Sequence, residues 1–288
     1  MRATTDDSGC SRELVLEYIR IAPLALCIRE INRFLAFDIL KRERIIDADA
    51  PVLDVGCGDG FWWTLQDVEG RSIYGVDISS AEITRAQRHI NAAMADISQT
   101  RPFPDINFPT IVANCSLEHV LDIDGALSVM SDCATDDGQL VMFVPAMKWF
   151  YQGHIQKYLL THYPRIAMTL SGMVNGFFQH WHLYSIPVWR SILAQNNWEV
   201  THVYGLGNAR SEMLFRLLLP MSVPGFFFKG LTGFYPNRAL KLVPDALLGP
   251  TSEVVRWIMT NPVVAGESPD AYEYVIVARR KQEGQADG

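Results

Sequence analysis

The chain has few of the residues and patterns that mark disulfide-bonded, metal-binding or nucleic-acid-binding proteins. It has five cysteines among 288 residues, an odd number without paired spacing, and neither a C-x-x-C pair nor a His-rich cluster. These absences indicate a reducing compartment and predict no metal site. The net charge of −7 argues against a nucleic-acid partner, which would require a basic surface.

The chain also lacks a recognisable secretory signal and an uninterrupted apolar span. Residues 1–9 are polar and acidic, without the basic and apolar regions of a signal peptide, so a cytoplasmic location is expected. The most apolar stretch, residues 213–228, contains Arg216, Pro220 and Pro224, which argues against a spanning helix of about 20 residues. The stretch is still suited to lie on a membrane, so peripheral contact with the inner membrane face is a second expectation.

What the chain does contain is an alternation of short apolar runs with helical patterns. Hydrophobic residues make up 49% and charged residues 20% of the sequence, which indicates a packed globular protein. From residue 51 onward the pattern predicts an α/β fold: a parallel sheet with helices on both faces and a ligand site at the carboxyl ends of the strands. Expected strands are 51–56, 72–77, 91–95, 109–115 and 138–144, and expected helices lie near 59–68, 80–90 and 122–135.

The most informative motif is a glycine turn at the end of the first expected strand. Residues 52–55 are followed by Gly56, Gly58 and Gly60, with Asp54 before the turn and Cys57 inside it. Glycine adopts positive φ and leaves no Cβ in the way, so a ligand can approach the backbone at the start of the next helix. The spacing is G-x-G-x-G, whereas dinucleotide sites have G-x-G-x-x-G.

Four passages in one order together resemble the class I S-adenosylmethionine-dependent methyltransferases. The glycine turn resembles their first motif, and the acids Asp77 and Asp96 each follow a short apolar run. Residues 103–108 (FPDINF) and 110–120 (TIVANCSLEHV) resemble the "LPFPD…LEHV" passage of the subgroup that includes ubiquinone-type and small-molecule methyltransferases. The resemblance covers roughly residues 50–145, with a weaker echo toward the C-terminus.

The resemblance implies a Rossmann-like, seven-stranded and mostly parallel sheet with an antiparallel last strand, and S-adenosyl-L-methionine as the cofactor. It assigns Asp54 to the methionine ammonium, Asp77 to both ribose hydroxyls, and Asp96 to the adenine amino group. A carboxylate suits the ribose because it offers two acceptor oxygens and no donor. The expected cofactor-binding residues are Asp54, Gly56, Cys57, Gly58, Gly60, Asp77, Ile78, Asp96, Ile97, Asn114, Cys115, Ser116 and His119.

Segments outside the resembling core are expected to cover it. Residues 1–46 predict a helical extension, broken near Pro23, which either covers the site entrance or packs only against the sheet. Residues 47–280 form the expected methyltransferase domain, and residues 281–288 the expected flexible tail. Insertions near 147–181 and 206–269 are rich in aromatic residues and predict a lid around an apolar pocket, lined in part by Phe226, Phe227 and Phe228.

Three histidines are candidates for a general base. His119 follows the fourth expected strand, His154 lies in the first insertion, and His182 matches the family's H-x-x-S histidine. Imidazole suits removal of a proton from a hydroxyl or amine acceptor near neutral pH. Two have a structural alternative: hydrogen bonding within its loop for His119, and a surface or structural role for His154. His182 is a candidate for either a base or a substrate contact.

The preferred hypothesis is a methyltransferase that acts by in-line displacement at an oxygen of a small, apolar or lipid-linked acceptor. A nicotinamide oxidoreductase would share the fold, but it leaves Asp96 and residues 117–119 without a role. A non-catalytic module that binds the cofactor or a partner would be favoured by loss of motif glycines or acids, and none is lost. The sequence leaves the oligomeric state open.

Overall fold

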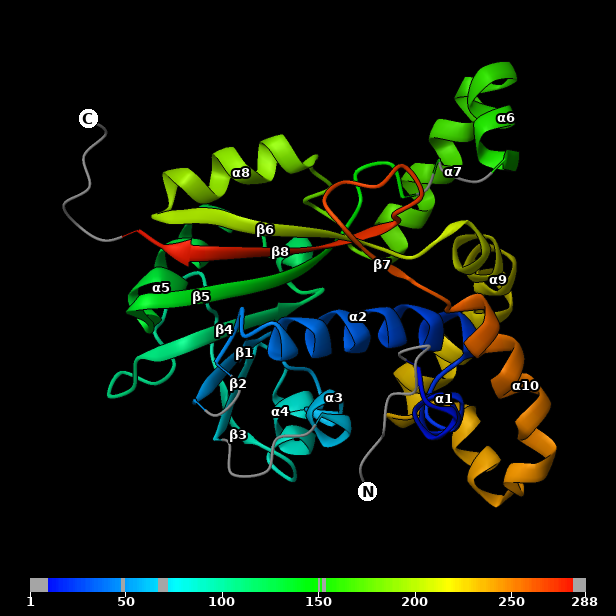
Figure 1. The fold of residues 1–288 in the computed structure, drawn as a ribbon, viewed down its shortest axis with the longest axis horizontal. Coiled ribbons are helices and arrows are strands. Elements are labelled where there is room, and N and C mark those ends of the chain that lie inside the picture. The colour runs from blue at the N-terminus through cyan, green and yellow to red at the C-terminus, as the bar shows by residue number, and fades with distance from the viewer. Residues whose placement is uncertain (1–9, 48–49, 67–71, 150, 152–153, 282–288) are drawn as a thin grey trace.

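A mixed sheet is the framework of the computed structural model, which describes residues 10–47, 50–66, 72–149, 151 and 154–281 (Figure 1). Within these residues the sheet has eight strands in the order β3-β2-β1-β4-β5-β8-β6-β7. The first five strands of this order are parallel, whereas β8 lies antiparallel between β5 and β6. The strands are β1 (Val52–Val55), β2 (Ile73–Asp77), β3 (Asn91–Met94), β4 (Phe108–Asn114), β5 (Ala134–Pro145), β6 (Trp198–Leu206), β7 (Val263–Ala265) and β8 (Glu273–Arg280).

The expected Rossmann-like α/β sheet with an antiparallel last strand is confirmed, but the expected number of seven strands is wrong. The eighth strand, β7, pairs with the end of β6 through Val263 and Val264, opposite Leu206 and Gly205. It has only three residues, so the alternation that identifies a strand in a sequence has no room to develop. The strand closes the second insertion by returning the chain along the edge of the sheet.

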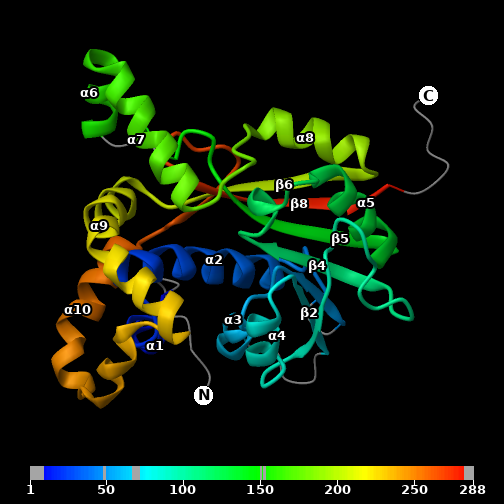
Figure 2. The same ribbon diagram turned by 180° about the vertical axis from the view of Figure 1, so that it is seen from behind.

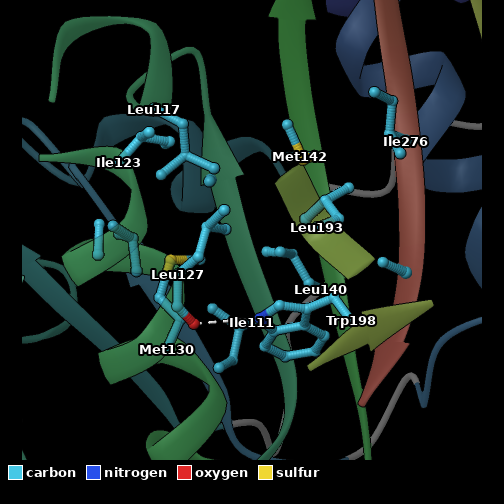
Figure 3. Close-up of a cluster of buried hydrophobic side chains, with 14 of the residues drawn as sticks. Ile111, Leu117, Ile123, Leu127, Met130, Leu140, Met142, Leu193, Trp198 and Ile276 are labelled. Atoms are coloured by element: carbon cyan, nitrogen blue, oxygen red, sulfur yellow. Dashed lines mark hydrogen bonds between the residues drawn. The ribbon is translucent and has the colours of Figure 1, made fainter. Parts of the chain in front are cut away.

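The alternating side chains of the central strands build two separate cores. Ile111 and Leu140 point to a face covered by α5 (Ile123–Cys133) and α8 (Ile186–Gln195), which Figure 3 shows in close-up. On this face the Trp198 indole Nε1 donates to the Leu127 carbonyl at 3.1 Å. Val112 and Val141, one residue further along each strand, pack on the opposite face. Successive residues of a strand point to opposite faces, so both faces need the helical cover that the sequence predicted.

The second face is covered by the N-terminal extension. Two helices, α1 (Arg12–Ile19) and α2 (Leu24–Arg42), are separated at Pro23, as expected. Phe37 and Leu40 of α2 join the core of this face together with Trp63. Trp63 belongs to α3 (Phe61–Leu65), which follows the glycine turn, and α4 (Ser80–Ala86) follows β2. The extension is therefore part of the α/β sandwich, and its N-terminal end also reaches the edge of the sheet where the motif residues lie (Figure 1).

The two insertions form a helical end of the molecule beyond the carboxyl ends of the parallel strands, as both views show (Figures 1 and 2). The first contributes α6 (His154–His162) and α7 (Pro164–Phe177), which follow β5. The second contributes α9 (Ala209–Thr232), the 3₁₀ helix η2 (Pro236–Leu242) and α10 (Asp245–Ile258). The predicted tail and residues 1–9 of the predicted extension lie outside the described residues, apart from Lys281.

The apolar stretch of the second insertion is more regular than the sequence indicated. Pro220 and Pro224 lie inside α9, which continues through both for 24 residues. Among the described helices, α9 is the one that is long and apolar enough to cross a membrane by length and composition. The prolines and Arg216 therefore do not end the helix, whereas the expectation that it does not span a membrane stays a prediction. Arg216 is accommodated by an ion pair with Glu212, one turn earlier on α9.

Candidate functional site

The glycine turn after β1 has the conformation that the sequence predicted. Gly56, Gly58 and Gly60 have φ angles of +72°, +54° and +69°, which residues with a Cβ rarely adopt. A Cβ at Gly56 would overlap the side chain of Ser116, and one at Gly60 would come within 3.3 Å of Ala86. A Cβ at Gly58 would meet nothing within 4 Å. The turn is therefore closely packed at its two ends and open in the middle, where a ligand can reach the backbone.

Asp54, at the end of β1, has one carboxylate oxygen fixed and one without a partner. Its side chain is buried, and Oδ2 accepts a hydrogen bond of 2.7 Å from the Trp63 indole. The other oxygen, Oδ1, is buried and has no hydrogen-bond partner among the described residues. Burial raises the pKa of Asp54 to about 7, against the lowering effect of the Trp63 hydrogen bond, and the charge of Asp77 raises it further. The site thus contains a buried acid that ionises readily once a cationic donor binds to it.

Asp77, at the end of β2, holds the glycine turn against the neighbouring strand. Its Oδ2 accepts the Gly58 N–H at 3.0 Å, and its Oδ1 accepts the Ser79 N–H at 2.8 Å. Each carboxylate oxygen can accept more than one hydrogen bond, so Asp77 retains capacity for a ligand hydroxyl. Ile78, directly after it, exposes 77% of its surface beside the turn.

Asp96 and Ile97 follow β3 and lie further out than the other two acids. Asp96 is exposed, and its oxygens accept hydrogen bonds from the Ser98 N–H, the Ser98 hydroxyl and the Gln99 amide. These hydrogen bonds, those from Ser98 first, lower its pKa and keep the acid ionised. The Ile97 side chain packs in the main core, so the part of this residue suited to a polar ligand is its backbone.

The end of β4 closes the site beside the glycine turn. The Ser116 hydroxyl donates to the Val55 carbonyl at 2.6 Å, which joins the ends of β4 and β1. Cys115 has a φ of +52°, and burial raises the pKa of its thiol. Burial also raises the pKa of Cys57, whose sulfur occupies the space left by Gly75 in β2. Both thiols therefore stay protonated and act as small packing groups. Asn114 Oδ1 is a second buried oxygen without a partner among the described residues.

The structure separates the three candidate histidines. Both ring nitrogens of His182 are engaged, Nε2 with the Val120 carbonyl at 2.7 Å and Nδ1 with the Tyr184 hydroxyl at 2.9 Å, so neither is left for a substrate proton. His154 begins α6, and its side chain lies outside the described residues. His119 lies in the 3₁₀ helix η1 (Leu117–His119) and is partly exposed. Its Nδ1 is 3.1 Å from the Gln179 carbonyl, which makes Nδ1 the donor and leaves the Nε2 lone pair available.

Glu118 and His180 surround His119. Glu118 is buried, with Oε1 3.8 Å from His119 Nε2, and burial raises its pKa. The rings of His119 and His180 stack with centroids 5.5 Å apart. Burial lowers the pKa of His180 to about 3, and the positive charge of Arg29 lowers it further, so this ring is neutral.

The Glu118, His119 and His180 side chains bring one ligand-capable atom each to within 4.8 Å of one another. Two ligands of a tetrahedral zinc ion are only about 3.3 Å apart when the bonds are about 2.0 Å long. The Arg29 guanidinium adds an unfavourable positive charge beside His180. We interpret this group as a charge-pairing and ring-stacking cluster around His119.

A buried ionic cluster, missed in the sequence, ties the N-terminal extension to this edge of the sheet. Glu273 of β8 accepts hydrogen bonds from Arg29 Nε at 2.7 Å and from Arg33 Nη2 at 2.6 Å. Although burial opposes ionisation, the two guanidinium charges hold the pKa of Glu273 below its usual value. The Cys115 sulfur lies 3.6 Å from the same Glu273 oxygen. The available signal was the i, i+4 spacing of two arginines on the apolar face of the α2 pattern.

The two insertions meet His119 at an apolar hollow. The hollow has a volume of about 360 Å³. Its lining residues are His119 of η1, Phe177 at the end of α7, Phe178 and Gln179 directly after α7, and Phe226 of α9. The Phe226 ring lies 5.7 Å from that of Phe177 and 5.9 Å from that of Phe178. A larger hollow of about 510 Å³ lies at the amino end of β2, beside Trp63 and Ile73, and contains none of the predicted site residues.

The profile of a methyltransferase-domain family matches residues 18–203, which is more than half of the chain. The chain therefore belongs to the family of S-adenosyl-L-methionine-dependent methyltransferases, and S-adenosyl-L-methionine is its cofactor. The expected family is thus confirmed, whereas the narrower "LEHV" subgroup remains a prediction.

Curated relatives and solved structures agree with this family. The chain is 34% identical over 110 residues to uncharacterized methyltransferases of Mycobacterium bovis and Mycobacterium tuberculosis. This match covers 35% of the chain and 55% of each relative, so the chain spans about half the length of the curated relatives that it matches.

Among solved structures, a putative sarcosine dimethylglycine methyltransferase from Galdieria sulphuraria is similar with a TM-score of 0.51 and 12% identity, over 88% of this chain and 85% of that one. The MccD protein is similar with a TM-score of 0.50 and 16% identity, over 85% of this chain and 96% of that one. At these identities the two likenesses establish the fold alone.

The site fits the cofactor by its own chemistry. Asp54 Oδ1 is a buried acceptor that lacks a donor, and an ammonium group supplies one. Gly58 leaves open space at the point where its N–H is held by Asp77. The predicted cofactor residues thus gather at the ends of β1, β2, β3 and β4, with His119 on the side that faces the insertions.

Proposed function

We propose that this methyltransferase transfers a methyl group to an oxygen of a small, apolar or lipid-linked acceptor by in-line displacement. The observation that carries the proposal is the hollow in which His119 meets aromatic side chains of both insertions. His119 is connected to the cofactor side of the site because its backbone N–H donates a hydrogen bond of 3.0 Å to the Ser116 carbonyl. Ser116 in turn packs against Gly56 and bonds Val55. A group in the hollow therefore lies one short loop away from the glycine turn.

The lining of the hollow favours an apolar acceptor. Three of its five lining residues are phenylalanines, and they come from segments about 50 residues apart in the chain. Apolar surface binds apolar ligand surface with about 25 cal/mol for each Å² removed from water. Of the predicted Phe226–Phe228 cluster, only Phe226 lines the hollow, whereas Phe227 and Phe228 face outward. Fewer residues of the Phe226–Phe228 cluster line the pocket than the sequence indicated.

We assign uptake of the proton from the acceptor hydroxyl to His119. The Gln179 carbonyl fixes Nδ1 as the donor, so Nε2 is the basic nitrogen. Glu118 Oε1, 3.8 Å from Nε2, stabilises the imidazolium that forms when the proton is taken up. A base within reach of the acceptor contributes roughly 10²–10⁴-fold to the rate of such a step.

The remaining site residues would hold and orient the cofactor. S-adenosyl-L-methionine supplies, when bound, an electrophilic methyl group on its sulfonium. Asp54 Oδ1, which lacks a partner among the described residues, would accept a hydrogen bond from the ammonium of the bound cofactor. Asp77 would accept hydrogen bonds from the ribose hydroxyls, and the hydrogen bond that it accepts from the Gly58 N–H keeps the turn in place. Orientation of two reactants in one site supplies several kcal/mol of the barrier, which is the main contribution the protein makes here.

Methyl-tritiated cofactor tests the proposal directly. The protein is incubated with labelled S-adenosyl-L-methionine and a total lipid extract, and label is counted in the organic and aqueous phases. Label in an organic-soluble product supports an oxygen acceptor if it is released as volatile methanol on ester hydrolysis or as methyl iodide on ether cleavage with hydriodic acid. Cofactor binding without transfer to any fraction would instead support a non-catalytic binding module.

The acceptor pocket predicts different effects for two neighbouring phenylalanines. Phe226→Ser removes a ring from the hollow and should raise the acceptor KM about tenfold or more, because most of the ring's transfer free energy of about 1.5–3 kcal/mol is lost. Phe227→Ser changes a ring that is 65% exposed and should leave KM within about twofold. Equal KM values for both variants, with the fold intact by circular dichroism, would exclude this hollow as the acceptor site.

Replacement of His119 should affect turnover more than cofactor binding. His119→Gln is expected to lower kcat about 100-fold at neutral pH, since the base is lost while the cofactor acids remain. The matched control is His202→Gln, whose ring lies on the exposed part of β6 and bonds Thr201. Stopped label-transfer assays and calorimetric titration of S-adenosyl-L-homocysteine measure the two properties separately. An unchanged kcat for His119→Gln would exclude this residue as the base.

A further inference from the structure

Two parts of the chain, which include the first insertion and the middle of the second, differ in charge from the rest of the protein. Residues 138–198 and 213–244 contain eight Lys and Arg residues and no Asp or Glu. The remainder of the chain therefore holds 17 of the 25 basic residues and all 32 acidic ones, a net charge of −15. A strongly acidic protein thus concentrates positive charge in the two segments that contain α6, α7, most of α9 and η2. Of the eight basic residues, Arg216 is paired with Glu212 at the start of α9.

The helices of these segments also expose apolar side chains to an unusual extent. On α9, Met213, Leu217 and Met221 follow one another at intervals of four residues, and each is 65–74% exposed. On α7, only Ala167 and Ser171 are buried. Its exposed apolar residues are Ile166, Met168, Leu170, Met173 and Phe177. Residues four apart share one face of a helix, so α9 presents a continuous apolar strip about 12 Å long.

The two helices lie at the same end of the molecule (Figures 1 and 2). They are in contact there through the rings of Phe177 and Phe226, 5.7 Å apart. The basic residues accompany the apolar surface: Lys157 and Arg165 are exposed on α6 and α7, and Lys241 is exposed on η2 after α9. Apolar residues flanked by exposed Lys and Arg are the combination by which helices bind in the interface of a membrane that contains anionic lipids.

From this combination the geometry points to a docking surface for an anionic lipid bilayer, formed by the exposed faces of α6, α7, α9 and η2. The docked α9 lies along the bilayer instead of crossing it. Its inner face is held by the protein, with Phe215 and Ser222 buried and Gly225 against Pro23, and it includes the Glu212–Arg216 ion pair. A helix that is anchored along one face in this way can only offer the other face to lipid.

The inference rests on the proposed function and deepens it. The hollow beside His119 is lined by Phe177 and Phe226, whose own helices carry the exposed apolar strip. A lipid-linked acceptor would then move from the bilayer into the hollow between α7 and α9 without its apolar part crossing water. The docked orientation places the acidic remainder of the protein away from the anionic lipid, which reduces charge repulsion.

Vesicle sedimentation tests the docking surface without any acceptor. The full chain is mixed with vesicles of phosphatidylcholine alone or with 30% phosphatidylglycerol, at about 0.1 and 0.5 M salt. We expect binding to the anionic vesicles that is at least tenfold stronger than to the neutral ones and that weakens in the higher salt. Protein that stays in the supernatant with both vesicle types would overturn the inference.

Matched variants locate the surface. The double variant Lys157→Glu, Arg165→Glu should lower the vesicle partition coefficient at least tenfold. The control double variant is Arg44→Glu, Arg88→Glu, which changes exposed residues shortly after α2 and α4. It should lower the partition coefficient less than threefold. Met213→Gln, Leu217→Gln and Met221→Gln together should also lower it at least tenfold. Equal losses for the two charge pairs would show general electrostatic attraction and overturn the inference.

Two further readouts separate the possible failures. The affinity for S-adenosyl-L-homocysteine should be unchanged in all three variants, so a loss of vesicle binding with normal affinity reports on docking and not on folding. If vesicle binding fails while label transfer and the Phe226 result hold, the docking inference fails alone. A stable dimer in sedimentation equilibrium that the triple Gln variant abolishes would assign the surface to a second copy of the chain and overturn the lipid assignment.

Discussion

Asp54→Asn is expected to weaken binding of S-adenosyl-L-methionine by about 100-fold at pH 7.5. The substitution keeps an oxygen for the Trp63 indole but removes the negative charge that faces the cofactor ammonium. Truncating one partner of a buried charged pair costs about 2–5 kcal/mol. Isothermal calorimetry measures the change, and Asp132→Asn, on the exposed end of α5, is the matched control with no expected effect.

The same variant has a pH signature. Burial gives Asp54 a pKa of about 7 in the protein without cofactor, and the cofactor ammonium binds the ionised form. Affinity should therefore rise as the pH increases from 5.5 to 7 and level off above that, while Asp54→Asn should show no such rise. The free energy of unfolding of the cofactor-free protein should change with pH in the opposite direction. Asp54 favours the fold most below the unfolded pKa of about 4, and this contribution is lost as the pH rises toward 7. Affinity of the wild type that does not change between pH 5.5 and 7 would contradict this role of Asp54.

Glu273→Ala is expected to lower the free energy of unfolding by about 3–5 kcal/mol. The change leaves the buried guanidinium groups of Arg29 and Arg33 without their shared carboxylate, and removing one partner of a buried ionic cluster has this cost. The loss should appear in urea denaturation as a lower midpoint with an unchanged m-value. Because the cluster ties α2 to the edge of the sheet beside Cys115, cofactor affinity should fall as well.

Arg279→Ala provides the comparison for Glu273. Arg279 pairs with Asp137 on the surface, where both side chains are at least half exposed. Such a pair contributes about 0–1 kcal/mol, so this variant should unfold at nearly the wild-type midpoint. Equal midpoints for Glu273→Ala and the wild type would show that the buried cluster adds no net stability.

The cofactor side of the site was predictable because its requirements are local. Positive φ at Gly56, Gly58 and Gly60 demands glycine, and this demand is visible in the sequence whatever surrounds the turn. Parallel strands place their carboxyl ends at one edge, so Asp54 and Asp77 converge once the strands are recognised. The period of the apolar runs identified those strands without knowledge of their partners.

The parts that were missed depend on contacts between distant segments. Arg29 and Glu273 are 244 residues apart, and no local pattern indicates that they pair. The engagement of His182 by Val120 and Tyr184 also depends on how two loops fold together, so its match to the family motif did not reveal that both nitrogens are used. The continuity of α9 through Pro220 and Pro224 conflicts with the helix propensity of proline and is stabilised by packing on α2.

Binding of S-adenosyl-L-methionine by the glycine turn and the strand-end acids can be seen in a crystal structure of the chain grown with S-adenosyl-L-homocysteine. We expect the ligand's ammonium within hydrogen-bond distance of Asp54 Oδ1, its ribose beside Asp77, and its sulfur on the side that faces His119. Ligand bound elsewhere, or no ligand at this edge of the sheet at saturating concentration, would exclude this cofactor site.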